Sequence, residues 1–102
     1  MSIVKDILRE EKERLQNLCD KYERELLALP KGSLSKKQRG NQWYYYIAFR
    51  EGSNVQFRYI GKEGSKQVRE MREKILQRRK IEKQLKEIKQ NMREIEKGLG
   101  GK

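Results

Sequence analysis

The sequence predicts an α+β fold in which two long helices bracket a three-stranded antiparallel β-meander. Near both ends of the chain, apolar residues recur at steps of about three and four, which is the spacing of one face of a helix. Between these stretches the residues become aromatic and β-branched, as strands prefer, and glycine-containing turns separate them. Because the chain has only 102 residues, we expect a single domain over residues 1–102.

The first helix is expected over residues 2–29. Ser2 stands where a helix N-cap belongs, and an apolar stripe follows it: Leu8, Leu15, Leu18, Tyr22, Leu26 and Leu29. Glu11 interrupts the stripe. Pro30 and Gly32 should end the helix, because proline lacks a backbone N–H and glycine favours turns.

The second helix is expected over residues 65–97. Its apolar stripe has two parts, whose spacing shifts by one position at residues 77–80. The first part is Val68, Met71 and Ile75, and the second is Ile81, Leu85, Ile88, Met92 and Ile95. Gly98, Gly100 and Gly101 should end the helix and leave a flexible tail over residues 98–102. The two stripes resemble coiled-coil seams, so the helices are expected to pair with each other or with a second copy of the chain.

The sheet is expected over residues 33–62. Residues 42–50 and 55–60 have strand character, and two-residue turns are predicted at Gly40-Asn41 and Gly52-Ser53. Such tight turns fix the register and therefore the two faces. The first face is predicted to carry Leu34, Lys36, Gln38, Trp43, Tyr45, Ile47, Phe49, Gln56, Arg58 and Ile60. The second is predicted to carry Ser33, Ser35, Lys37, Arg39, Tyr44, Tyr46, Ala48, Arg50, Val55, Phe57 and Tyr59.

The first face is expected to pack on the helices, because Trp43, Ile47 and Phe49 give it the bulkier apolar centre. The second combines hydroxyl groups, cations and tyrosine rings, which suits contacts with phosphates and bases. A register error of one residue in either turn would exchange the two faces. Alternation sends half of the 43–46 aromatic run inward, so Tyr44 and Tyr46 are either core residues or contact residues.

The chain carries a net charge of +11, from 26 Lys and Arg against 15 Asp and Glu. Residues 1–30 hold six basic and seven acidic side chains, residues 31–66 hold eight and two, and residues 67–102 hold twelve and six. The surplus therefore belongs to the sheet segment and the second helix. Such a surplus favours binding to a polyanion and makes that binding depend on salt.

Several function classes are not expected. The chain has no histidine, and Cys19 has no second cysteine with which to form a disulfide or a zinc site. We therefore expect no catalytic residues, no metal and no cofactor, and not an enzyme. No apolar run approaches the roughly 18 residues of a membrane span. A lone cysteine suits a reducing compartment, so a cytoplasmic location is expected.

The central motifs resemble those of a known family. They are LPKGSLSKK at residues 29–37, WYYY at 43–46, REG at 50–52 and YIGK at 59–62. This core is similar to that of a family of short uncharacterised bacterial and archaeal proteins, in which it lies between two charged helices. That resemblance implies the architecture but no activity.

The sheet more loosely resembles the arm-type DNA-binding domain of phage-type tyrosine recombinases, whose sheet enters the major groove. That resemblance implies the following contact residues: Ser33, Lys36, Lys37, Arg39, Tyr44, Tyr46 and Arg58. Three other cations of residues 31–66 complete the candidate site: Arg50, Lys62 and Lys66.

Three further features each have two interpretations. Cys19 is either a core thiol or a reactive one. Residues 61–66, GKEGSK, form either a strand-to-helix turn capped by Ser65 or an anion site at a helix N-terminus. Arg78, Arg79 and Lys80 form either a solvated helix face or a phosphate-binding patch.

Together these patterns predict a small basic protein that binds DNA or RNA, with DNA favoured, through one face of its sheet. A homodimer or a protein complex formed through the helices is also expected. The alternative is a protein-binding adaptor or inhibitor, such as a mobile-element-encoded antagonist or antitoxin, that acts through its helical hairpin. An adaptor would leave apolar residues exposed on the helices, whereas a groove-binding protein needs cations on one sheet face.

Overall fold

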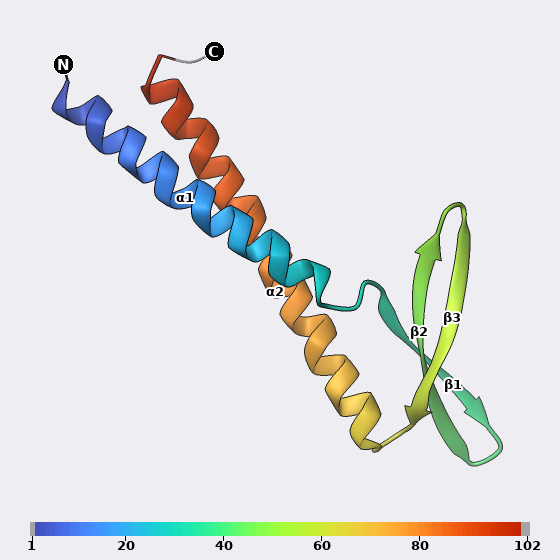
Figure 1. Ribbon diagram of the computed structural model, residues 1–102. Helices are drawn as coiled ribbons and strands as arrows, with labels where there is room; N and C mark the ends of the chain where they lie inside the picture. Colours follow the sequence, from blue (N-terminus) through green and yellow to red (C-terminus); the bar gives the residue numbers. More distant parts are fainter. Residues whose placement is uncertain (1, 101–102) are drawn as a thin grey trace. The chain divides into compact units, whose positions relative to one another are not determined.

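The computed structural model describes residues 2–100, and its elements follow the order helix, three strands, helix (Figure 1). They are α1 (Ile3–Leu27), β1 (Ser33–Arg39), β2 (Gln42–Glu51), β3 (Asn54–Lys62) and α2 (Lys66–Gly98). The predicted α+β arrangement is confirmed. In the tail predicted over residues 98–102, Gly101 and Lys102 lie outside the described residues.

The chain forms two compact units, and α2 contributes to both. The hairpin unit contains the described residues up to Ala28 together with those from Lys80 onward. The sheet unit spans Leu29–Arg79 and therefore holds the three strands and the first part of α2.

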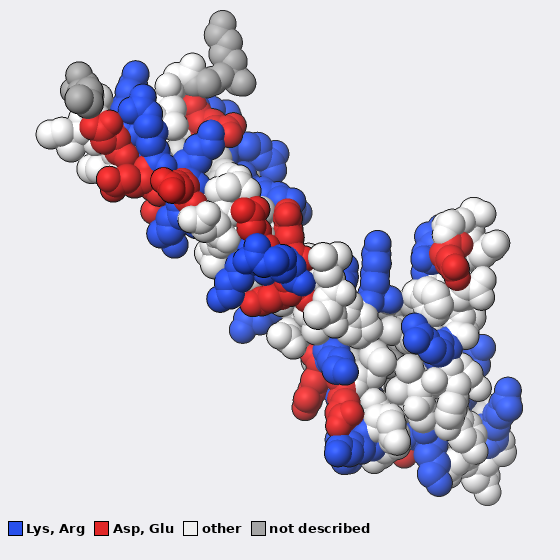
Figure 2. All heavy atoms as spheres, viewed as in Figure 1, with Lys and Arg blue, Asp and Glu red and all other residues white. Residues whose placement is uncertain are grey.

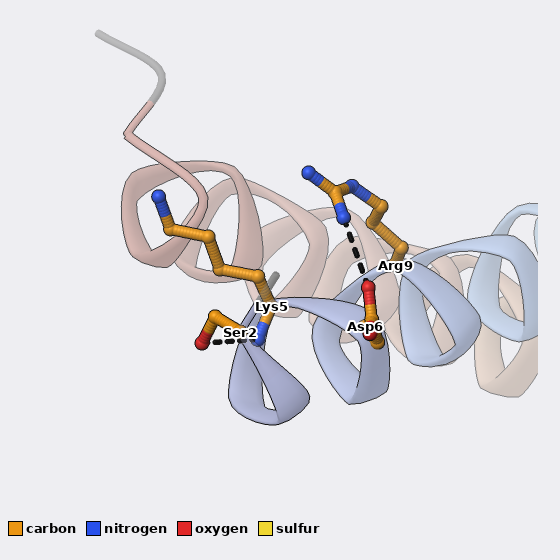
Figure 3. A network of polar contacts seen from close by, with 4 residues as sticks. All are labelled: Ser2, Lys5, Asp6 and Arg9. Atoms are coloured by element: carbon orange, nitrogen blue, oxygen red, sulfur yellow. Dashed lines mark hydrogen bonds and ion pairs between the residues drawn. The ribbon is translucent and has the colours of Figure 1, made fainter.

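The N-terminal cap predicted for the first helix is present. Ser2 has extended backbone angles, and its Oγ accepts a hydrogen bond from the backbone N–H of Lys5 at 3.4 Å (Figure 3). One turn into the helix, Asp6 forms an ion pair of 3.1 Å with Arg9. A carboxylate near a helix N-terminus is favourable because the helix dipole is positive there. The helix ends at Leu27, two residues before the predicted end.

In the hairpin unit, α1 lies beside the C-terminal half of α2 in antiparallel orientation (Figure 1). Lys12 pairs with Glu96 at 3.2 Å, and Glu23 pairs with Lys89 at 3.4 Å. Residue numbers therefore rise along α1 as they fall along α2, as antiparallel helices require. Four of the residues buried between them come from the predicted stripes, and Cys19 is the fifth: Leu15, Cys19, Ile81, Leu85 and Ile88. Pairing of the two helices within one chain, one of the two expected arrangements, is therefore confirmed.

The sheet has the order β1-β2-β3, with both pairs antiparallel. Arg39 lies opposite Gln42 and Glu51 lies opposite Asn54, so both turns contain two residues, as predicted. Gly40 and Gly52 have φ angles of 61° and 63°, and among the described residues only glycines have positive φ. Glycine at the first turn position with a negative φ at the second is the pattern of a type II′ turn.

One face of the sheet packs on the first part of α2, and it is the predicted face. Ile47 is 2% exposed, as is Val68 of the helix, and Ile75 is also buried. The guanidinium of Arg72 lies 5.4 Å from the ring centre of Tyr45. At Gly61, a Cβ atom would be 3.5 Å from the Val68 side chain, so helix and strand approach closely there. We call this the covered face.

The expectation that Trp43 and Phe49 are buried with Ile47 is wrong, since both remain partly exposed. The physical reason is that one helical segment covers three strands in this unit and shields mainly the middle of the face. Cations cover part of the remainder: the Lys36 ammonium lies 4.6 Å from the Trp43 ring centre, and the Arg58 guanidinium lies 5.5 Å from that of Phe49. Such contacts contribute modestly at exposed sites.

Replacement of Ile47 by Ala should lower the free energy of unfolding by about 2–5 kcal/mol, because it removes one of the two best-buried side chains of the sheet unit and leaves a cavity. Val55→Ala is the matched control, since Val55 is 51% exposed and its loss should cost no more than about 0.5 kcal/mol. Urea unfolding followed by Trp43 fluorescence measures both. Equal destabilisation by the two variants would contradict the assignment of the covered face.

Candidate nucleic-acid interface

The face opposite the covered face is open to solvent in the sheet unit. Directly opposed residues share a face, and the register therefore defines this open face as follows: Ser33, Ser35, Lys37, Arg39, Gln42, Tyr44, Tyr46, Ala48, Arg50, Val55, Phe57, Tyr59 and Lys62. Three of its apolar or aromatic side chains are about half exposed: Val55 (51%), Phe57 (51%) and Tyr59 (54%). The side-chain types are those predicted for the second face.

Three tyrosine rings form a cluster on the open face. The ring of Tyr59 on β3 lies 6.2 Å from that of Tyr44 and 5.6 Å from that of Tyr46, both on β2. The rings meet at 49° and 68°, so neither pair is stacked face to face. The Lys37 ammonium adjoins the cluster, 5.2 Å from the Tyr46 ring centre and 4.6 Å from that of Phe57.

The open face carries cations and no carboxylate. Lys37, Arg39, Arg50 and Lys62 belong to it, whereas Glu51 and Glu63 do not. Within residues 2–100 none of these four cations has an ion-pair partner. Figure 2 shows the contrast: red and blue spheres alternate along the paired helices, while the sheet is mostly white and blue with little red.

An irregularity in β3 decides the position of Lys62. Tyr46 lies opposite Tyr59, but Tyr45 lies opposite Gly61 and Tyr44 opposite Lys62, so β3 has one extra residue, a β-bulge. In a regular strand Lys62 would share the face of Arg58, which is the covered face. The bulge instead places Lys62 beside Tyr44 on the open face. No local sequence pattern predicts the bulge.

The tyrosine cluster borders an open hollow of ≈ 390 Å³, lined by Arg39, Tyr44, Tyr46 and Tyr59. This volume lies within the range of about 300–1,000 Å³ that is typical of small-molecule sites. Its lining combines three π-systems and their hydroxyl groups with one guanidinium. Such a lining can stack on a flat ring, donate hydrogen bonds and neutralise an anion.

The structure brings together most, but not all, of the residues predicted to form the site. Seven lie on the open face: Ser33, Lys37, Arg39, Tyr44, Tyr46, Arg50 and Lys62. Lys36 and Arg58 lie on the covered face. Lys36 forms an ion pair of 3.0 Å with Glu63, whose hydrogen-bonded carboxylate raises the pKa of the lysine above its ordinary value. Lys66 lies in the first turn of α2, 3.7 Å from Glu70.

The predicted site omitted two prominent aromatic residues of the open face, Phe57 and Tyr59. Both were assigned to the correct face, and the turn at Gly52-Ser53 also implied that Tyr59 lies opposite Tyr46. The signal that could have identified them is this cross-strand pairing, because rings opposite one another in an antiparallel pair approach closely.

Among the other basic candidates, Arg78 makes a structural contact. Arg78 donates a hydrogen bond of 3.1 Å to the backbone carbonyl of Leu29 and so links α2 to the segment before β1. Ser65 caps α2, since its Oγ accepts a hydrogen bond from the backbone N–H of Val68 at 3.4 Å, and Arg69 donates to the Gly64 carbonyl at 3.1 Å. The strand-to-helix turn with its Ser65 cap is thus confirmed, whereas an anion site there stays a prediction.

In the described part of the chain, no group of three His, Cys, Asp or Glu side chains is placed to hold a metal ion. A search of the same residues for a helix with the length and apolar character of a membrane span finds none.

The family model DUF6788, which describes a domain of unknown function, matches residues 7–70. The chain belongs to this family. The DUF6788 match includes most of α1, the whole sheet and the first residues of α2. No curated protein matches the chain, and no solved structure does. The resemblance to the recombinase domain therefore stays a prediction.

Within the region matched by DUF6788, Cys19 is a core residue of the hairpin unit. Its side chain is 4% exposed, and its Sγ donates a hydrogen bond of 3.5 Å to Oε1 of Glu23. Burial raises the pKa of the Cys19 thiol above its ordinary value, and the neighbouring Glu23 carboxylate raises it further. The interpretation of Cys19 as a core thiol is confirmed.

Cys19 should therefore react slowly with a disulfide reagent, because the thiolate is the reactive form and both its population and its access are reduced. At pH 8 we expect the folded DUF6788 protein to react at least about tenfold more slowly than the urea-unfolded chain. The absorbance of the released thiolate measures both rates. Equal rates would contradict the burial of Cys19.

Proposed function

We propose that the protein binds nucleic acid through the open face of its sheet, with DNA as the favoured partner. The observation that carries this proposal is the grouping of Lys37, Arg39, Arg50 and Lys62 on one face that has no carboxylate. Cations of this kind bind phosphates and release the counterions condensed around them.

The neutral side chains of the open face fit the same partner. Tyrosine rings stack on bases and their hydroxyl groups donate hydrogen bonds, while Ser33 and Ser35 can contact phosphate oxygens. DNA is favoured because antiparallel strands are an established element for reading a DNA groove. The looser similarity to recombinase arm-binding domains points the same way.

The alternative function, a protein-binding adaptor or inhibitor, has one supporting observation. Three apolar residues in the first turns of α1 are exposed: Ile3 (78%), Val4 (66%) and Ile7 (58%). Ile3 and Ile7 are four residues apart and therefore lie on the same side of the helix. An exposed apolar patch of this kind is typical of an interface with another protein.

The nucleic-acid proposal predicts a steep salt dependence. The logarithm of the affinity for duplex DNA should fall with the logarithm of the salt concentration, by roughly 0.9 per phosphate neutralised. Replacement of both Lys37 and Arg39 by Gln should flatten this slope by about two units and weaken binding to all sequences alike, since phosphate contacts carry no sequence information. Fluorescence anisotropy at several salt concentrations measures the slope.

The matched control replaces Lys83 and Lys86, two exposed lysines of α2, by Gln. It removes as much charge from the chain but none from the open face. If both double variants change the slope equally, binding follows net charge and the open face is not the interface.

The alternative predicts self-association or a protein complex through the start of α1. If the partner is a second copy, light scattering at about tens of micromolar should give the mass of a dimer, and Ile3→Ser with Ile7→Ser should reduce it to that of a monomer. Leu27→Ser is the control, because Leu27 is 89% exposed but lies at the other end of α1. A monomeric mass for the unaltered protein would exclude the homodimer.

A further inference from the structure

We infer that the ligand of the open face is an unpaired nucleic-acid strand, and that the hollow lined by Arg39, Tyr44, Tyr46 and Tyr59 receives one of its bases. This inference rests on the proposed function and narrows it to a class of substrate, with an unpaired strand in place of the duplex groove as the form that is bound. The shared chemistry is a flat, unpaired base on a phosphate backbone, which both single-stranded DNA and single-stranded RNA provide.

The side chains in the centre of the open face are suited to the faces of bases, not to their edges. A duplex groove presents base edges, which are read by hydrogen-bonding side chains such as Arg, Asn and Gln. Here the centre consists of Tyr44, Tyr46 and Tyr59. The Tyr59 ring contacts each of the other two, and neither pair is stacked face to face. An aromatic platform of this kind stacks on bases, and only unpaired bases expose their faces.

The hollow adds a guanidinium to the platform. Arg39 lines it together with the three tyrosines, and it has no ion-pair partner in the described part of the chain. A guanidinium is planar and stacks on π-systems while keeping its charge. A base in the hollow can therefore lie against a tyrosine ring while Arg39 covers it or binds its phosphate.

The spacing of the aromatic rows also favours an extended strand. Tyr44 and Tyr46 are two residues apart on β2, so their rows are about 7 Å apart along the strand direction. This is about twice the roughly 3.4 Å rise per nucleotide along one strand of a duplex. A strand that places neighbouring bases on neighbouring rows must therefore be unstacked and extended.

Two lysines of the open face adjoin the aromatic platform. Lys37 already lies over the rings of Tyr46 and Phe57, and Lys62 is held beside Tyr44 by the bulge in β3. A phosphate bound to either lysine keeps its base within reach of the platform. Charge and stacking thus act on the same nucleotide.

The test compares ligands of equal length: the three single strands carry equal backbone charge, and the duplex carries about twice as much. Single strands of about twelve nucleotides, one of DNA and one of RNA, are compared with the DNA duplex and with an abasic DNA strand, by anisotropy at each of several salt concentrations. We expect at least one natural single strand to bind about tenfold or more tightly than both the duplex and the abasic strand. This comparison uses the unaltered protein and does not depend on the folding of a variant.

Variants of Tyr59 then test the stacking. Tyr59→Leu should weaken binding of the single strand by about five- to a hundredfold and leave the abasic strand unaffected, whereas Tyr59→Phe, which keeps the ring, should bind like the unaltered protein. Circular dichroism shows that each variant is folded. If Tyr59→Phe loses as much affinity as Tyr59→Leu, the hydroxyl group and not stacking is responsible, and the inference is overturned.

The remaining outcomes separate this inference from the function on which it rests. If the duplex binds as tightly as the natural single strands, and binding falls with salt, the protein binds nucleic acid but the inference of an unpaired ligand is overturned. If none of the four ligands shows salt-dependent binding, the proposed function fails, and this inference fails with it.

Discussion

Within the sheet unit a single helical segment, the first part of α2, is available to cover three strands. Because side chains alternate between the two faces of a strand, half of the aromatic residues of β2 and β3 must point away from that helix. With 40% charged residues, the chain has no further apolar layer to cover these aromatic side chains. The half-exposed state of Phe57 and Tyr59 follows from this shortage, and so does the existence of an aromatic face open to a ligand.

The identity of the open face depends on backbone geometry at a few positions. Two-residue turns at Gly40 and Gly52 set the register, and a slip of one residue would exchange all side chains between the faces. Gly32, with a φ of 139°, lies so close to Ala48 that a Cβ atom would collide with the Ala48 carbonyl oxygen. The start of β1 can therefore approach β2 only with glycine at this position.

The sequence predicted those features that depend on local chemistry. The caps at Ser2 and Ser65 and the turns at Gly40 and Gly52 each need only a few neighbouring residues, and the structure has all four. The two faces of the sheet then followed from alternation. The helical pairing followed from the apolar stripes, although the sequence left open whether the partner was the same chain.

The features that were not predicted depend on tertiary contacts. The bulge at the end of β3 coincides with the close approach of Gly61 to Ser65 and Val68, which no local pattern reveals. The partial exposure of Trp43 depends on how far one helix reaches across the sheet. For the candidate site, charge and residue type identified the cations, and alternation separated Lys37 from Lys36. The ion pair between Lys36 and Glu63 on the covered face is a tertiary contact that the sequence did not predict.

The cations of the hairpin unit and those of the open face differ in their ion pairs. In the hairpin unit lysines face carboxylates across the two helices, as in Lys12–Glu96 and Lys89–Glu23. Within residues 2–100 the cations of the open face have no such partners. Two of them, Lys37 and Arg39, lie on neighbouring rows about 7 Å apart, which is less than the screening length of about 8 Å at physiological salt. Their mutual repulsion is a cost of the folded sheet. An anion bound to this face removes that cost and also adds binding free energy available only to the folded state, so a polyanionic ligand stabilises the arrangement that binds it.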